Sequence, residues 1–139
     1  MDTKTYDDYM EALKDLYIIE DMEAWNPNIR SKTSIKSTPT RHFVDTSIAC
    51  RSLGVSPNDL MNDLESFGLF FEDFAVRNLS VYAGCIGGVL KHYRDNAGLE
   101  FDAVVHLEDG RWGGIEIKLG GAYRREDGVY VAPINLLKP

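Results

Sequence analysis

The spacing of apolar positions changes along the chain, from a helical period in the first two thirds to a strand period afterwards. A helix over residues 4–16 is predicted by apolar residues three or four positions apart: Tyr6, Tyr9, Met10, Leu13 and Leu16. Ser56 followed by Pro57 is a strong helix start. Apolar stripes continue from there to Val81, and Gly68 is expected to bend this region or to separate two helices.

From Val89 onward, apolar and polar residues alternate. This period predicts three strands of one antiparallel meander over Val89–Asp95, Leu99–Leu107 and Arg111–Lys118. The two short loops between the strands end in Gly98 and Gly110, and glycine suits the left-handed position of a three-residue hairpin loop. The second half of the chain is therefore expected to pack helices on a small sheet.

The region between the first helix and Ser56 contains a polar, basic stretch over residues 30–41, which is typical of a wing-like hairpin or an exposed loop. His42-Phe-Val follows as a short buried strand, and Asp45 is a good N-cap for a helix that ends near Gly54. The net charge of −7 argues against nucleic-acid binding over the whole surface. A local basic strip that could touch nucleic acid, or that is simply a solvated loop, consists of Arg30, Lys32, Lys36 and Arg41.

Composition places the chain among ordinary globular proteins, with 139 residues of which 44% are hydrophobic and 27% charged. No apolar run approaches the length of about 18 residues that a membrane span needs. The cysteines Cys50 and Cys85 form no CxxC motif, and the acidic N-terminus does not resemble a secretory signal. We therefore expect a cytoplasmic protein that has no membrane partner.

The hairpin loops also predict which side chains meet across the sheet. A three-residue loop at 108–110 places Asp102 opposite Glu116, and Glu100 opposite Lys118. A three-residue loop at 96–98 places Arg94 opposite Glu100, and His92 opposite Asp102. The other face of the middle strand then forms an apolar stripe of Leu99, Phe101, Ala103, Val105 and Leu107.

Two carboxylates on adjacent strands can share a hard divalent cation such as Mg²⁺. A lysine on the same face can orient a metal-bound water or stabilise charge that develops on a phosphorus centre. This combination is typical of metal-dependent phosphodiester hydrolysis. The alternative is a solvated sheet face whose charges form cross-strand ion pairs.

Several segments resemble a known family. The stretches FGLFFEDFAVRNL, HYRD, GLEFDAVV and GGIEIKLG resemble the PD-(D/E)xK, restriction-endonuclease-like domain of unknown function at the C-terminus of prokaryotic AAA-type ATPases. The earlier stretches YMEALKDLYIIEDMEAWNPNIRSK and RHFVDTSIACRSLG resemble the winged-helix connector of the same proteins. The resemblance implies an α+β fold with a partial winged-helix segment over residues 1–54. A truncated helix-plus-antiparallel-sheet nuclease-like domain would follow over residues 55–139.

By this resemblance, Asp102 and Glu116 are metal-binding carboxylates, and Lys118 is the catalytic lysine of the E-x-K pair. Glu72 matches the helix glutamate that such nucleases often place beside the metal, which would be Mg²⁺ or Mn²⁺. The implied function is metal-dependent phosphodiester hydrolysis or nucleic-acid binding. The alternatives are a non-catalytic binding or assembly module and a truncated remnant without enzymatic activity.

The chain departs from the family pattern in ways that change its expected partners. It contains no GxxxxGK[ST] phosphate loop, so an ATPase partner would act in trans. The stretch Leu119–Tyr123 that follows Lys118 is also too short to supply the crossover helix and strand of the family. An uncovered apolar sheet face near Phe101, Val105 and Ile117 is therefore expected to drive self-association.

Overall fold

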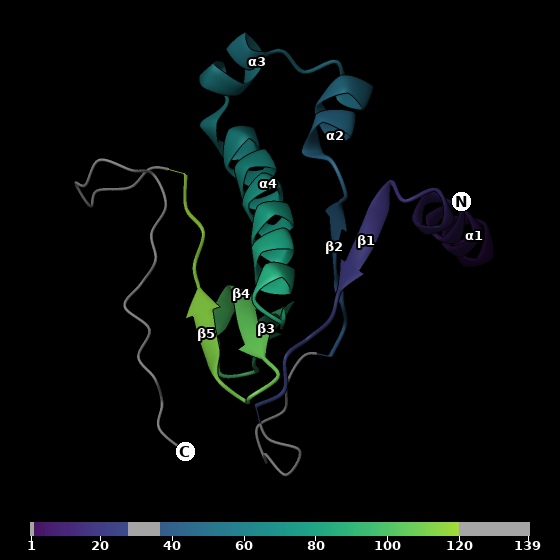
Figure 1. Ribbon diagram of the computed structural model, residues 1–139. Coiled ribbons are helices and arrows are strands. Elements are labelled where there is room, and N and C mark those ends of the chain that lie inside the picture. The colour runs from purple at the N-terminus through teal and green to yellow at the C-terminus, as the bar shows by residue number, and fades with distance from the viewer. Residues whose placement is uncertain (1, 28–36, 120–139) are drawn as a thin grey trace.

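The computed structural model describes residues 2–27 and 37–119. In these residues the chain is an α+β protein with four helices and two small antiparallel sheets (Figure 1). This confirms the fold class expected from the sequence. In chain order the elements are α1 (Thr3–Asp15), β1 (Ile19–Met22), β2 (Thr40–Phe43), α2 (Thr46–Leu53), α3 (Pro57–Asn62), α4 (Leu64–Cys85), β3 (Gly88–Arg94), β4 (Glu100–Leu107) and β5 (Trp112–Ile115).

The N-terminal part consists of α1 and a two-stranded sheet. β1 pairs antiparallel with β2, with Ile19 opposite Phe43. Asp21 on β1 joins these elements, because its carboxylate lies 2.6 Å from Lys14 Nζ and 3.0 Å from Arg41 Nε. The wing-like hairpin or loop expected over residues 30–41 lies mostly outside the described residues.

Local capping signals fix the boundaries of α2 and α3. Asp45 caps α2 by accepting a hydrogen bond from Ser47 N, and Gly54 ends the helix with a left-handed φ of 67°. Ser56 begins α3 with a capping box, in which its side chain and that of Asp59 bond reciprocally to the backbone. The helix starts and the helix end predicted here are confirmed.

The long helix α4 differs from the expectation in one respect. Gly68 lies inside this continuous helix, so the prediction that it separates two helices is wrong. The break falls at Asp63, which leaves the helical region of backbone conformation and accepts a hydrogen bond from Ser66 N. A cap of this kind starts a new helix, whereas a single interior glycine costs only about 1 kcal/mol.

β3, β4 and β5 form an antiparallel sheet with β4 in the centre. Ala103 pairs with Ile115 and His106 with Trp112, as the loop lengths predict. Gly98 and Gly110 adopt positive φ angles of 93° and 87° in the two loops. The hairpin geometry inferred from the sequence is therefore confirmed for these residues.

An irregularity in the β3–β4 ladder was not predicted. Lys91 pairs with Val104 and Tyr93 with Phe101, which leaves Asp102 and Ala103 together opposite His92. This β-bulge interrupts the alternation of faces along β4. The predicted register holds from the loop to Tyr93, with Arg94 opposite Glu100, but His92 faces both Asp102 and Ala103 and not Asp102 alone. The predicted apolar stripe is also interrupted, because Phe101 belongs to the same packed cluster as Val104 and not to a regular row with Ala103.

That cluster forms the core of the sheet on the face away from α4. Trp25, Tyr93 and Val104 are buried, and Phe101 and Trp112 pack against them. The Trp25 ring centroid lies 4.4 Å from that of Trp112. α4 lies over the opposite face of the sheet (Figure 1). Its buried residues are Val76 and Ala83.

The segment that follows β1 contacts the three-stranded sheet and contributes Trp25 to this core. Ala24 forms an isolated parallel bridge with His92, and Trp25 N donates a hydrogen bond of 2.6 Å to His92 O. Trp25 therefore links the N-terminal part of the chain to the three-stranded sheet. None of the helices in the described residues combines the length and apolarity that a membrane crossing requires.

Candidate functional site

Acidic side chains from α4 and β4 gather where the helix passes over the sheet. Glu72 lies in the middle of α4 and is half-buried. Asp102 lies in the β-bulge of β4, is also half-buried, and accepts a hydrogen bond of 2.6 Å from Ile117 N. Glu100 precedes it on the same strand and forms an exposed ion pair with Arg94 at 3.4 Å.

The electrostatics of these carboxyl groups are unfavourable for ionisation. Burial raises the pKa of Glu72, and the negative charges of Asp102 and Glu100 raise it further. Burial likewise raises the pKa of Asp102, and the Ile117 hydrogen bond only partly opposes that effect. Glu116 and Glu100 add to the increase for Asp102. A bound cation would relieve this repulsion, which is why the location is a candidate site.

The E-x-K residues follow β5 directly. Lys118 Nζ lies 2.5 Å from Glu116 Oε1, and both side chains are more than half exposed. The Lys118 charge lowers the pKa of Asp102, whereas Glu116 raises it, so both residues act electrostatically on the bulge carboxylate. The predicted Asp102–Glu116–Lys118 group is therefore brought to one region, with Lys118 in contact with Glu116.

The donor set suits a magnesium-like ion better than a closed metal centre. Within residues 2–27 and 37–119, no three His, Cys, Asp or Glu side chains converge closely enough to hold a metal ion. Mg²⁺, however, is commonly held by only one or two protein carboxylates, with water and substrate phosphates completing its octahedron. Glu72 and Asp102 are the candidates for such a pair, because both are half-buried and the charge of Asp102 raises the pKa of Glu72.

A pH-dependent gain in stability is expected when the Glu72 charge is removed. A carboxyl group whose pKa is raised in the folded state binds more protons there than in the unfolded state, so stability falls as pH rises through that pKa. Glu72→Gln should therefore raise the free energy of unfolding at pH 7 without divalent cations. The gain should disappear below the ordinary glutamate pKa of 4.5.

The comparison uses urea unfolding at several pH values, with Glu65→Gln in the exposed first turn of α4 as the matched control. Glu65→Gln should give no stabilisation at pH 7. Equal responses of the two variants, or a gain for Glu72→Gln that does not depend on pH, would contradict the electrostatic description of the site.

Sequence reasoning missed Asp73, which follows Glu72. Its carboxylate accepts hydrogen bonds from Phe43 N at 2.9 Å and from Thr46 Oγ1 at 2.7 Å. His42 Nδ1 on β2 lies 3.3 Å from the same carboxylate. Burial alone would raise the pKa of Asp73, but the hydrogen bonds from His42, Thr46 and Phe43 outweigh it and lower the pKa.

Asp73 therefore holds β2 and the start of α2 against α4, next to the candidate site. His92, which the hairpin register predicted opposite Asp102, makes a contact that the sequence did not predict. Its ring Nε2 lies 3.1 Å from Thr38 O, and burial lowers its pKa. No periodic pattern marks these residues, because each contact joins elements far apart in the sequence.

Of the four residues in the predicted basic strip, the structure describes only Arg41. Its Nε donates to Asp21 Oδ1 at 3.0 Å and its Nη1 to Tyr6 Oη at 3.1 Å. Arg41 is thus paired within the N-terminal part of the chain. The other three residues of the strip, Arg30, Lys32 and Lys36, lie outside the described residues.

Comparison with known families divides the chain into two successive segments. Residues 1–59 match a family model described as Domain of unknown function (DUF8612), and residues 67–135 match one described as Domain of unknown function (DUF4143). No curated protein and no solved structure matches the chain. The second match is in line with the ATPase-associated domain that these residues resemble, and it contains most of α4 and the whole three-stranded sheet.

Proposed function

We propose that the chain carries a nuclease-like domain in which Glu72 and Asp102 bind Mg²⁺ or Mn²⁺ during phosphodiester hydrolysis, with Glu116 beside them in its pair with Lys118. The observation that supports this most is the raised pKa of Glu72 and of Asp102, which reflects the burial of both carboxyl groups and, for Glu72, the nearby charge of Asp102. Carboxyl groups whose pKa is shifted from the ordinary value are frequent at functional sites.

Each residue has a distinct role in the proposal. Asp102 accepts the Ile117 hydrogen bond through Oδ2, and its Oδ1 would be the oxygen that binds the ion. Lys118 carries a positive charge within reach of Asp102 and would stabilise negative charge on the substrate phosphate. A bound divalent ion would supply Lewis acidity and lower the pKa of a bound water.

Asp73 supports the site indirectly. It fixes the helix that carries Glu72 through its bonds to β2 and Thr46. Positioning of this kind matters because a misplacement of about 1 Å can cost two orders of magnitude in rate. We therefore regard Asp73 as a positioning residue and not as a metal ligand.

The second candidate function is a non-catalytic binding or assembly module. The close Lys118–Glu116 pair favours this function, because the lysine charge is then used to neutralise the exposed Glu116 carboxylate.

Nucleic acid, a second copy of the chain and an ATPase acting in trans are the partners proposed for either function. For self-association the relevant surface is α4, which exposes Phe74 and Tyr82, since Phe101 packs against the core.

A cleavage assay tests the enzymatic proposal. The full chain is incubated with single-stranded DNA, duplex DNA and RNA in Mg²⁺ or Mn²⁺, and in parallel with EDTA. The proposal predicts cleavage of at least one substrate that EDTA abolishes. Binding without cleavage, unchanged by EDTA, would instead support the non-catalytic module.

A further inference from the structure

A hydroxyl, an imidazole and a carboxylate are in consecutive contact where β2 meets α4. The hydroxyl oxygen of Thr40 lies 3.2 Å from His42 Nε2. The other ring nitrogen, His42 Nδ1, lies 3.3 Å from Asp73 Oδ1 on α4. In enzymes that use an activated nucleophile, a base lies at about such a distance from the nucleophile and a third group orients the base. The three residues therefore have the connectivity of a nucleophile–base–acid triad.

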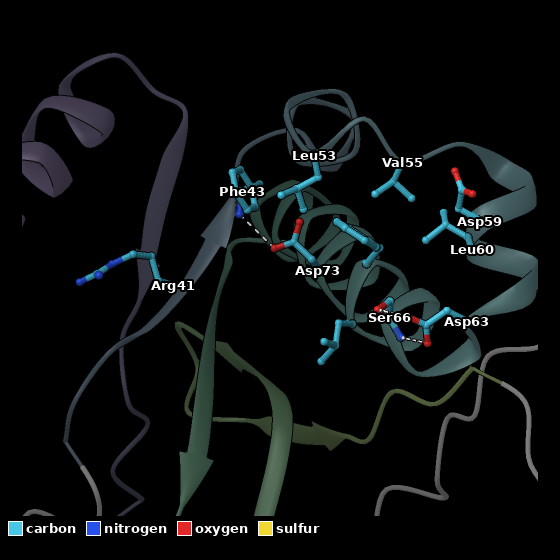
Figure 2. Close-up of a pocket in the computed structure, with 11 residues that line it drawn as sticks. Arg41, Phe43, Leu53, Val55, Asp59, Leu60, Asp63, Ser66 and Asp73 are labelled. Atoms are coloured by element: carbon cyan, nitrogen blue, oxygen red, sulfur yellow. Dashed lines mark hydrogen bonds between the residues drawn. The ribbon is translucent and has the colours of Figure 1, made fainter.

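The partners of the imidazole indicate which of its nitrogens carries the proton. Asp73 acts as a hydrogen-bond acceptor: Figure 2 shows the bond that it receives from Phe43 N, and Thr46 Oγ1 donates a second one. We therefore infer that His42 Nδ1 donates to Asp73, which leaves Nε2 of the neutral ring as an acceptor. The Thr40 hydroxyl then donates its proton toward Nε2, and this direction activates the hydroxyl oxygen for attack.

The exposure of the three residues is also suited to this chemistry. Thr40 is exposed at the start of β2, so a substrate can reach its hydroxyl from solvent. The side chains of His42 and Asp73 are only 10% and 14% exposed and are held by their neighbours. The contact between Thr40 and His42 joins two residues of one strand, so it does not fasten separate elements together as the Asp73 contacts do.

We propose that Thr40 is an acyl-accepting nucleophile, with His42 as its general base and Asp73 as the residue that orients His42. The substrate class is activated carboxylic esters with small uncharged acyl groups, because the Asp73 carboxylate and the net charge of −7 disfavour anionic ones. This site is separate from Glu72 and Asp102, and its activity does not depend on the proposed phosphodiester hydrolysis.

The proposed step is a single acyl transfer. Thr40 Oγ1 attacks the acyl carbon and forms the new carbon–oxygen bond, while its proton moves to His42 Nε2. The bond between the acyl carbon and the oxygen of the leaving alcohol then breaks, and His42 returns the proton to that oxygen. The products are the free alcohol and an ester on Thr40.

The test is acetylation of the full chain by p-nitrophenyl acetate, with the acetylated residues located and quantified by peptide mass spectrometry. Thr40 should react at least about tenfold faster than Thr38, since a positioned general base accelerates such steps by about a hundredfold or more. Thr38 is the internal control, because it is also exposed and, in the described residues, meets a histidine only through its backbone oxygen. If water removes the acetyl group quickly, the same nucleophile is detected as p-nitrophenol release that Thr40→Val abolishes.

Two histidine variants test the role of the base. His42→Asn should lower the rate at Thr40 to that at Thr38, because the asparagine amide can still donate to Asp73 but provides no basic nitrogen. His106→Asn, on β4 beside Trp25, should leave the rate unchanged.

Three results would overturn the proposal. The first is equal acetylation of Thr40 and Thr38 in the unmodified chain without p-nitrophenol release that depends on Thr40. The second is a rate at Thr40 that His42→Asn retains, and the third is acetyl transfer to His42 with Thr40 unmodified. Circular dichroism verifies the fold of each variant. The comparison of the two threonines in the unmodified chain decides the outcome if a variant fails to fold.

Discussion

Asp102→Asn is expected to reduce metal-dependent cleavage by about a hundredfold or more, because one carboxylate ligand supplies several kcal/mol of interaction with a bound cation. The fold should survive, since the asparagine amide oxygen can still accept the hydrogen bond from Ile117 N. Lys118→Ala is expected to cause a comparable loss through a different route, the missing positive charge beside the phosphate.

The measurement is the initial rate of cleavage at saturating Mg²⁺. Asp109→Asn is the matched control, because Asp109 is an exposed carboxylate in the loop between β4 and β5 and pairs with Arg111 at 2.7 Å. Its rate should equal that of the unmodified chain. If Asp102→Asn and Lys118→Ala kept the same residual cleavage as the control, the assignment of both residues would be wrong.

Trp25→Ala is expected to lower the free energy of unfolding by about 3–5 kcal/mol, which is the usual cost of deleting a buried aromatic side chain. Trp25 is only 5% exposed and contacts both Tyr93 and Trp112 through its ring. The substitution opens a cavity at the junction between the N-terminal segment and the sheet.

Urea denaturation gives this value directly, and Tyr9→Ala provides the control. Tyr9 is 64% exposed on α1, so its truncation should change stability by no more than about 0.5 kcal/mol. A loss below about 1.5 kcal/mol for Trp25→Ala would show that Trp25 does not join the two parts of the chain into one core.

The features that sequence predicted well depend on short-range chemistry. Asp45, Gly54 and Ser56 set helix ends through contacts within four residues, and the loop glycines Gly98 and Gly110 fix two hairpins. Such signals are read locally, so they can be recognised without knowing what packs against them. The β4–β5 register follows from loop length in the same way.

The features that sequence missed depend on long-range packing. The bulge at Asp102 and Ala103 arises where β4 faces His92, and no local pattern marks it. Trp25 is buried where Ala24 bridges to His92, 68 positions later, and no local pattern marks that contact. The interior glycine Gly68 was misread because α4 packs along its length and tolerates the small local cost.

The residues of the candidate site likewise include some that the sequence predicts and others that it does not. Asp102, Glu116 and Lys118 were predicted to lie in one region from their spacing and the hairpin register, and the effect of Glu116 and Lys118 on the pKa of Asp102 agrees with that placement. Glu72 came from the resemblance, and its raised pKa agrees with a position close to Asp102. Asp73 and His42 could not be inferred, because their contact joins residues 31 positions apart on α4 and β2.

Thermal unfolding during a Mg²⁺ titration tests most directly whether Glu72 and Asp102 form the proposed divalent-cation site. A ligand that binds only the folded state stabilises it by about 2.7 kcal/mol at a hundredfold excess over its dissociation constant. We predict a saturable rise in the unfolding temperature for the unmodified chain and for Asp109→Asn, and none for Asp102→Asn. A chain that unfolds at the same temperature with and without Mg²⁺, or a rise that Asp102→Asn retains, would contradict the account.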